Sequence, residues 1–460
     1  MKKLLLFFYF VFFTVSYSLQ ASVLFTTPRY VHIPDANFKK YLLNSTTINS
    51  NRDSLISEQE AQQITTLNVS LLEIKDLTGI EAFTELSFLN CSNNLLSNLN
   101  TYNNLKLNWL ICSNNKISVL EVNKNINLTN LDCEFNQLSY LNLTKDSALT
   151  YLHCANNFIN ALNLSANFKL TDLDCNGNKI KELDLSTNGD LGRLICSRNQ
   201  LTNLNLNFNN ALSELDCSRN KLTTLHTNAN TLLTILYCNN NQITELEVST
   251  NEVLADLWCH NNQLTTLNLI GTTGLMRLSC SDNKLTVLNI NSNKGLTALY
   301  CNNNQLTDLV VTNNIGLKEL GCSKNLLSAL DLSTNVDLVE LWCDNGQLTT
   351  LNLNNNKKLT GVWCYNNQLS SIDISNSEAL VSLSCLNNKL GWLDLRANKA
   401  LLYLWCQKNA TLKTVCLNTA QMMLTNNFIS VLEKDATCAW STKCKILPAR
   451  AVNSLKKAAK

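Results

Sequence analysis

Residues 149–167 read LTYLHCANNFINALNLSAN, and this stretch is one copy of the unit that decides the fold. Sixteen cysteines, from Cys91 to Cys406, follow one another at intervals of 21 residues without a single slip. A period that holds over more than 300 residues indicates a stack of similar supersecondary units, which is a solenoid. Solenoids mostly serve as binding surfaces, so the pattern favours recognition over catalysis.

Each unit holds two similar halves. In the first half Leu152 and Cys154 are two residues apart, and in the second half Leu162 and Leu164 are. Apolar pairs with a period of two are typical of short strands with one buried face. We therefore expect a mainly β repeat solenoid with two short parallel strands per 21-residue turn. Sixteen turns, stacked at a strand spacing of about 4.8 Å, would make a rod of about 75–80 Å.

Asparagine follows both halves in regular columns. Three residues after the repeat cysteines, asparagine fills 15 of 16 positions, and Gly346 is the exception. Thirteen residues after them, asparagine fills 12 of 15 positions, and the exceptions are Asp146, Thr272 and Ser377. Buried backbone groups need partners, and an asparagine amide offers donors and an acceptor. We therefore interpret both columns as scaffold rather than as a site.

The pattern L-x-x-L-x-C-x-x-N-x-L-x-x-L-x-L-x-x-N resembles the bacterial leucine-rich repeat in its nested form, over about residues 64–410. The first turn, with Ile64, Leu67, Val69 and Gly79, resembles the first repeat of internalin-like proteins. The resemblance implies a curved or flattened solenoid that binds other molecules, most often proteins. It does not imply which partner is bound.

The repeat cysteines are not spaced for disulfides. In-register parallel strands hold neighbouring Cβ atoms about 4.8 Å apart, whereas a disulfide needs about 3.8 Å and converging Cβ vectors. A single straight column also cannot supply the convergent ligands of a metal site. We therefore predict sixteen unpaired thiols that are buried as small apolar side chains.

Three further cysteines, Cys416, Cys438 and Cys444, break the register. They lie in residues 411–444, which resemble the C-terminal cap that follows such repeats in secreted bacterial proteins, and residues 445–460 form a short tail. A disulfide from Cys416 to Cys444 would fix this cap, and Cys438 is the competing partner.

Residues 22–63 are expected to form a helical N-terminal cap with a loop that resembles an EF-hand. The oxygen-bearing residues follow the spacing of a calcium loop, and the candidate ligands are Asn49, Asn51, Asp53, Ser57 and Glu60. Asn49 replaces the usual aspartate and Ser54 the usual glycine, so we expect weak calcium binding at most. The alternative is a cap that keeps only the loop's shape and shields the first apolar turn.

Residues 1–21 begin with Lys2-Lys3, continue with an apolar run and end in small residues. This pattern predicts a secretory signal peptide, and the alternative is an uncleaved membrane anchor. Loss of two lysines takes the net charge from +2 to 0, which gives nucleic-acid binding no electrostatic basis. No other transmembrane segment is visible, so we expect a secreted or cell-surface protein.

The position just before each repeat cysteine should point outward, and acids occupy it early in the chain and aromatic residues late. Together with neighbours on the same face, the predicted ligand-binding residues are Tyr237, Trp258, Tyr300, Trp342, Trp363, Tyr365, Tyr403 and Trp405. The matching column of the second strand, from Glu121 to Asp394, holds no aromatic residue. Exposed aromatic patches favour interfaces; the alternative is cross-strand packing that only stabilises the sheet.

These features predict a secreted, non-enzymatic recognition protein that binds a protein or a cell-surface glycan through the aromatic face. The alternative is a structural surface adhesin or matrix component. The four histidines, His32, His153, His226 and His260, have no catalytic or metal-ligand pattern around them in the sequence. No nucleic-acid partner is expected, and calcium in the N-terminal cap is the one cofactor considered.

Overall fold

Eighteen parallel strands form one sheet that runs along the whole stack. The computed structural model describes residues 29–424 and 431–444; the predicted signal peptide and the 445–460 tail lie outside the described residues. In spatial order the strands are β1 (Thr66–Asn68), β2 (Phe88–Asn90), β4 (Trp109–Ile111), β6 (Asn130–Asp132), β7 (Tyr151–His153), β8 (Asp172–Asp174), β9 (Arg193–Ile195), β10 (Glu214–Asp216), β12 (Ile235–Tyr237), β14 (Asp256–Trp258), β15 (Arg277–Ser279), β16 (Ala298–Tyr300), β17 (Glu319–Gly321), β18 (Glu340–Trp342), β19 (Gly361–Trp363), β20 (Ser382–Ser384), β22 (Tyr403–Trp405) and β24 (Val431–Glu433).

The repeat period sets the register of this sheet. Leu131, Leu152 and Leu173 pair with one another across β6, β7 and β8. Their side chains point into the coil and are fully buried, as is Cys154. All sixteen repeat cysteines are unpaired and buried, as the spacing predicts.

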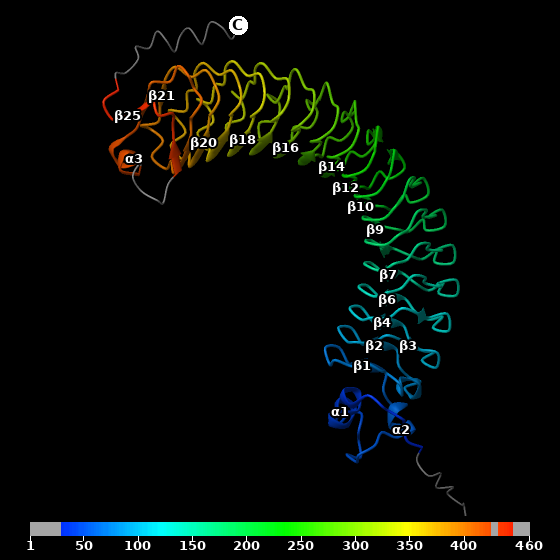
Figure 1. Cartoon of the computed structure of the whole chain (residues 1–460). Coiled ribbons are helices and arrows are strands. Elements are labelled where there is room, and N and C mark those ends of the chain that lie inside the picture. The colour runs from blue at the N-terminus through cyan, green and yellow to red at the C-terminus, as the bar shows by residue number, and fades with distance from the viewer. Residues whose placement is uncertain (1–28, 425–430, 445–460) are drawn as a thin grey trace, which may run out of the picture.

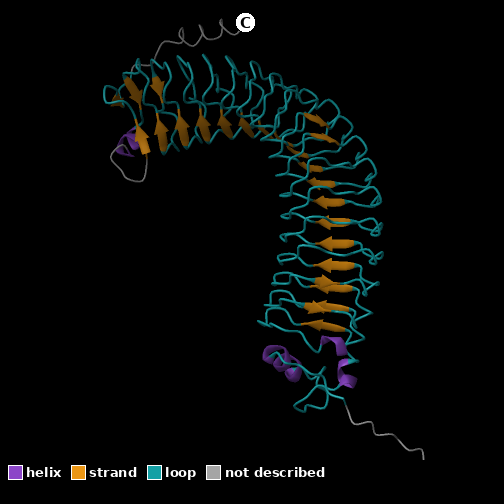
Figure 2. Cartoon of the chain, turned by 45° about the vertical axis from the view of Figure 1, so that its right-hand side comes forward, coloured by secondary structure: helices purple, strands orange, loops and turns teal. Residues whose placement is uncertain are grey.

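The stack is curved, and the long sheet lines its concave side (Figure 1). This curvature agrees with the curved or flattened solenoid that the leucine-rich repeat resemblance implies. The second halves of the turns lie on the other side of the coil, where curvature spreads them beyond the spacing of a regular ladder. Strands are correspondingly few on that side (Figure 2). Among the described residues they pair in three places, beside an isolated bridge between Asn352 and Asp373: β3 (Leu99–Asn100) with β5 (Leu120–Glu121), β11 (Thr224–His226) with β13 (Glu245–Glu247), and β21 (Leu393–Asp394) with β23 (Thr414–Cys416) and β25 (Ala439–Ser441).

The two asparagine columns join successive turns. Asn157 Nδ2 donates to the carbonyl oxygens of Cys133 and Cys154 at 3.0 and 3.1 Å, and its Oδ1 accepts from Leu138 N at 2.9 Å. In the second column, Asn167 Nδ2 donates to the carbonyl oxygens of Leu143 and Asp146. The Asn157 amide thus bonds backbone groups of its own and neighbouring turns, and the Asn167 amide bonds two carbonyls of the preceding turn, as expected for scaffold residues.

The N-terminal cap contains α1 (Ala36–Asn44) and α2 (Glu58–Ala61), and a 3₁₀ turn, η1 (Ile80–Ala82), follows in the first repeat. Asp35 connects it to the first turn, because one carboxylate oxygen caps α1 at Asn37 N and Phe38 N while the other accepts from Lys75 N at 2.8 Å. Phe38 is buried and covers the first apolar turn.

The C-terminal cap is one longer, irregular turn that continues both ladders. After β23 come α3 (Thr419–Leu424), then β24 beside β22 and β25 beside β23. A disulfide joins Cys416 and Cys444, and Cys438 is free and buried.

Candidate functional site

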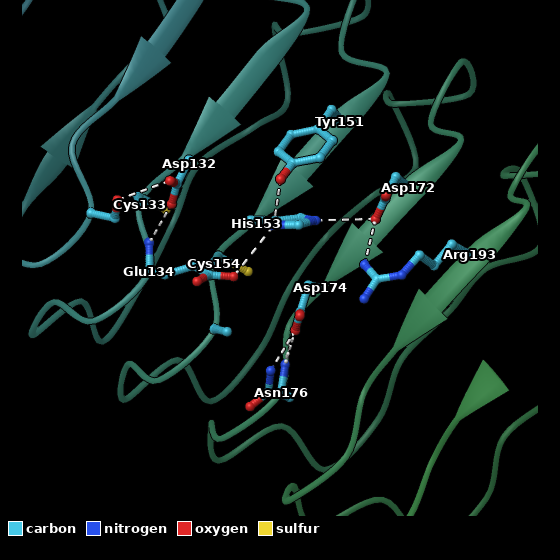
Figure 3. A network of polar contacts seen from close by, with 12 residues as sticks. Asp132, Cys133, Glu134, Tyr151, His153, Cys154, Asp172, Asp174, Asn176 and Arg193 are labelled. Carbon is cyan, nitrogen blue, oxygen red and sulfur yellow. Dashed lines mark hydrogen bonds and ion pairs between the residues drawn. The ribbon is translucent and has the colours of Figure 1, made fainter. Parts of the chain in front are cut away.

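The outward side chains of the concave sheet form two surfaces. In the N-terminal arm a polar cluster consists of Asp132, Glu134, Tyr151, His153, Asp172, Asp174 and Arg193, on and just after β6 to β9 (Figure 3). Further along the stack lies the aromatic stripe, defined as Tyr237, Trp258, Tyr300, Trp342, Trp363, Tyr365, Tyr403 and Trp405, on and just after β12 to β22. Both surfaces arise because the residue before each repeat cysteine points away from the core.

His153 is the centre of the polar cluster. Its Nε2 lies 3.1 Å from Asp172 Oδ1, and Arg193 Nη1 donates to that same oxygen at 3.1 Å. Its Nδ1 lies 2.6 Å from the Tyr151 hydroxyl and 3.4 Å from Glu134 Oε1. Burial alone would lower the pKa of His153, but the hydrogen bonds with Asp172 and Glu134 raise it to about 9.

Carboxylates outnumber cations in this cluster. Asp174 is almost completely buried, and burial raises its pKa, with Glu134 as a further cause. Burial also raises the pKa of Asp132. Arg193 pairs with Asp172 and Glu214. The surroundings of His153 are therefore strongly acidic.

Sequence reasoning missed this cluster, since it found no metal-ligand pattern around any histidine. The neighbours of His153 come from the turns before and after it, at a separation of 19 residues for Asp172. The outward column before the repeat cysteines does place Asp132, His153 and Asp174 in successive turns. It does not show which way their side chains turn.

The predicted aromatic residues all lie on or directly after strands of the concave sheet, but in three separate groups. Tyr237 and Trp258 lie 5.4 Å apart between ring centroids. Trp342 lies 6.4 Å from Tyr300 and stacks on Trp363 at 5.2 Å with an interplanar angle of 6°. The third group is the stacked pair Tyr403 and Trp405, at 6.2 Å. Tyr365 follows β19, and burial and Asp344 raise its pKa.

Small residues separate and shape these groups. Ser279 and Ser384 occupy the outward position just before a repeat cysteine in the turns between one aromatic group and the next. Gly321 leaves space for Tyr300, since a Cβ there would lie 3.2 Å from Tyr300 Cδ1. Gly361 leaves space for Trp363, because a Cβ there would lie 2.4 Å from Trp363 Cη2.

Carboxylates three residues before the repeat cysteines hold several rings by hydrogen bonds. Asp256, buried to 2% exposure, accepts from Trp258 Nε1 at 2.7 Å and from the Tyr237 hydroxyl at 3.3 Å, and pairs with Arg277. The Tyr300 hydroxyl donates to Glu319. The polar atoms of these three rings are thus held by carboxylates of the sheet.

The rings differ in how far solvent reaches them. Trp258 is 40% and Tyr403 37% exposed, and the other six are half-buried. The second side of the coil is not wholly free of aromatic residues, because Tyr140 and Trp392 lie two residues before its outward column, and Tyr140 is 62% exposed. No run of rings forms there among the described residues.

The loop of the N-terminal cap is closed by hydrogen bonds. Glu60 Oε1 accepts from Ser50 N at 2.9 Å, and its Oε2 accepts from Ser57 N at 3.0 Å. Burial would raise the pKa of Glu60, but hydrogen bonds with Ser57, Asn51 and Ser50 lower it. Asn49 Oδ1 is buried without a partner. Both Glu60 carboxylate oxygens therefore already accept hydrogen bonds from the protein, and calcium binding stays a prediction.

Three solved structures illustrate what this chain is similar to. The functional domain of InlJ from Listeria monocytogenes, which includes a cysteine ladder, is 31% identical over 84% of this chain and 80% of that one, with a TM-score of 0.68. The internalin InlF, also from Listeria monocytogenes, is 20% identical over 78% of this chain and 97% of that one, with a TM-score of 0.55. The plant peptide hormone receptor RGFR1, in complex with RGF2, is 20% identical over 83% of this chain and 67% of that one, with a TM-score of 0.68.

No protein-family model matches the sequence, and no curated protein matches it. Within residues 29–424 and 431–444, no helix has the length and apolar character needed to cross a membrane.

Proposed function

Because the chain belongs to the internalin-like leucine-rich repeat proteins, we propose that it is a secreted or cell-surface recognition protein without enzymatic activity. Its ligand is a protein or a cell-surface glycan, bound by the aromatic stripe on the concave sheet. The same fold holds a peptide hormone in RGFR1, so a partner in the concave space is compatible with this architecture.

The placement of the rings carries the proposal. Both sides of the coil offer outward positions with the same repeat, yet the stripe occurs only on the concave side among the described residues. Aromatic side chains bring a large apolar contact area at a low cost in conformational entropy. A concave surface places several such rings around one partner, which favours an interface over simple sheet packing.

The stacking geometry favours a protein over a glycan as the ligand. A sugar ring needs a free aromatic face, but Trp342 and Trp363 cover one face of each other at 5.2 Å. This half-buried pair of rings suits contact with the side chains of a protein surface. Trp258 and Tyr403 are the more exposed rings and the best candidates for stacking on a sugar.

The experiment is a protein and glycan array probed with the mature chain, followed by titration of each hit. We expect saturable binding that is weakened by Trp258→Ala or Tyr403→Ala. The matched control is Asn142→Ala, in the outward column on the other side of the coil. Hits that bind the control and the aromatic variants equally would contradict the proposal.

A structural role in a surface layer or matrix is the second candidate. The observation that favours it is the C-terminal end of the stack, where β24 pairs only with β22 and β25 only with β23 in the described residues. Strand edges of this kind allow end-to-end association. Sedimentation of the purified chain over a range of concentrations tests it, because a matrix component assembles without any partner and a recognition protein does not.

A further inference from the structure

We propose that Glu134, His153 and Asp174 form a binding site for one divalent transition-metal ion, with Zn²⁺ the best fit, on the concave face. The inference is separate from the aromatic stripe and does not depend on the proposed function. It rests on the ligand geometry, on the orientation of the imidazole and on the charge of the polar cluster.

The three ligand atoms come from three successive turns and converge. They all lie within 4.8 Å of one another. Tetrahedral zinc with bonds of about 2.0–2.1 Å holds its ligand atoms about 3.4 Å apart. His153 Nδ1 and Glu134 Oε1 lie 3.4 Å apart, so this pair already has the required separation. The register of β7 and β8 places Asp174 beside His153. Its Oδ1 accepts hydrogen bonds from Asn176 N and Nδ2 at 3.0 and 2.7 Å, so the Asp174 side chain has to turn from Asn176 to complete the triangle.

The imidazole is oriented for metal binding. Asp172 Oδ1 lies 3.1 Å from His153 Nε2 and would accept a hydrogen bond from it in the neutral tautomer that binds a metal, in which the free nitrogen, Nδ1, lies 3.4 Å from Glu134 Oε1. Arg193 in turn holds Asp172 at 3.1 Å. The Tyr151 ring stacks on the imidazole with centroids 3.9 Å apart and restricts its rotation. A carboxylate on the second nitrogen is the usual companion of a metal-binding histidine.

The composition of the cluster selects the kind of ion. One imidazole nitrogen and two carboxylate oxygens suit zinc and its neighbours better than calcium or magnesium, which prefer oxygen alone. The thiols of Cys133 and Cys154 are buried inside the coil and do not belong to the converging group. The side chains of His153 and Glu134 are 17% and 22% exposed, so an ion can enter from the concave space and keep a water molecule as its fourth ligand.

Two groups compete with the ion for Nδ1. The Tyr151 hydroxyl lies 2.6 Å away and must turn aside when the ion binds. A second proton on the imidazole would make His153 a cation between Glu134 and Asp172, and that arrangement is the rival explanation for the cluster. The ion and this proton compete for the same lone pair, and the zinc titration below decides between them.

The test is calorimetric titration of the full chain with Zn²⁺ after treatment with a chelator, together with the absorption spectrum of the Co²⁺ form. We expect one ion per chain and a spectrum without the strong charge-transfer band of thiolate ligation. His153→Gln, Glu134→Gln and Asp174→Asn should each abolish binding. Asp172→Asn should weaken it about 10–100-fold, because Asp172 positions the histidine without touching the ion.

The matched control is His260→Gln, since His260 is also a half-buried histidine beside the concave sheet but belongs to no converging group in the described residues. This variant should keep full binding. Protection of the buried thiols shows that each variant is folded. The proposal is overturned if the wild-type chain binds no Zn²⁺, if binding survives His153→Gln, or if the Co²⁺ spectrum shows thiolate ligands.

Discussion

Asn167 Nδ2 donates to the carbonyl oxygen of Asp146 at 2.9 Å, whereas neither carboxylate oxygen of Asp146 has a hydrogen-bond partner. Both residues belong to the second asparagine column, and both side chains are fully buried. An asparagine at position 146 would donate to the carbonyl oxygens of Val122 and Asn125, as its equivalents do one turn away. Asp146 cannot do so while it is ionised.

Asp146→Asn should therefore stabilise the solenoid. Burial raises the pKa of Asp146 from its ordinary value to about 7, so this carboxyl ionises less readily in the folded chain than in the unfolded chain. The buried carboxyl therefore lowers the free energy of unfolding of the wild-type chain. This loss grows as pH rises from about 4 to about 7 and is constant above that range. We expect the substitution to increase the free energy of unfolding by about 2–4 kcal/mol at neutral pH, measured by denaturant titration at several pH values.

The matched control is Asn167→Asp, which should create the same defect one turn further along. Its free energy of unfolding should fall below that of the wild type, with the same dependence on pH. An Asp146→Asn variant whose gain is equal at pH 4 and pH 7 would show that the carboxylate is not the cause.

The cysteine column should be chemically inert in the folded chain. The repeat cysteines are buried and unpaired, and burial raises the pKa of the Cys91 thiol to about 12, so the reactive thiolate is scarce at neutral pH. Thiol labelling of the native protein should modify almost none of the sixteen, and denaturation should expose all of them. Mass spectrometry that finds disulfides between successive members would contradict this expectation.

The N-terminal cap should bind calcium weakly at most. Glu60 accepts hydrogen bonds from Ser50 N and Ser57 N, and the ion would have to replace them. We expect a dissociation constant no tighter than about 10⁻⁴–10⁻³ M, measured by calcium titration of the full chain, with binding lost in Glu60→Gln. The control is Glu58→Gln, which changes an acid of the same helix outside the predicted ligand set. Tight binding of one ion per chain would show that the ligand spacing outweighs the hydrogen bonds.

The sequence predicts the strands well because one spacing repeats in every turn. A strand assigned from Leu152 and Cys154 in one turn therefore predicts the strand at the same position in the other turns. The repeat spacing alone does not predict curvature, since curvature comes from a small difference in turn spacing between two sides of the coil; only the family resemblance implied it. A third column was also overlooked. Residues two positions after the repeat cysteines adopt a left-handed backbone, as Asn156 does with φ 53° and Phe135 with φ 50°, and asparagine is frequent there because it tolerates this conformation.

The candidate sites depend on side-chain directions that a single sequence does not contain. The outward column predicted that the rings of Trp342 and Trp363 face the concave space. Their stacking depends on the space left by Gly361, which no residue pattern indicated. The polar cluster around His153 likewise needs the rotamers of Glu134 and Asp172, which come from the turns on either side of it.

Trp342 and Trp363 offer the most direct test of the aromatic stripe. Truncation of either ring to alanine should weaken binding to an identified ligand by about 1–3 kcal/mol if the pair is an anchor. The free energy of unfolding should fall by a smaller amount, because the lost ring contact contributes only about 0.5–1.5 kcal/mol beyond its buried area and both rings lie outside the core. Asp331→Ala and Asn352→Ala, in the outward column on the other side of the coil, serve as controls and should leave affinity unchanged. Affinity and denaturation midpoint have to be measured on the same variants. If both tryptophan variants keep full affinity while their midpoints fall, the rings only pack the sheet, and the ligand binds elsewhere.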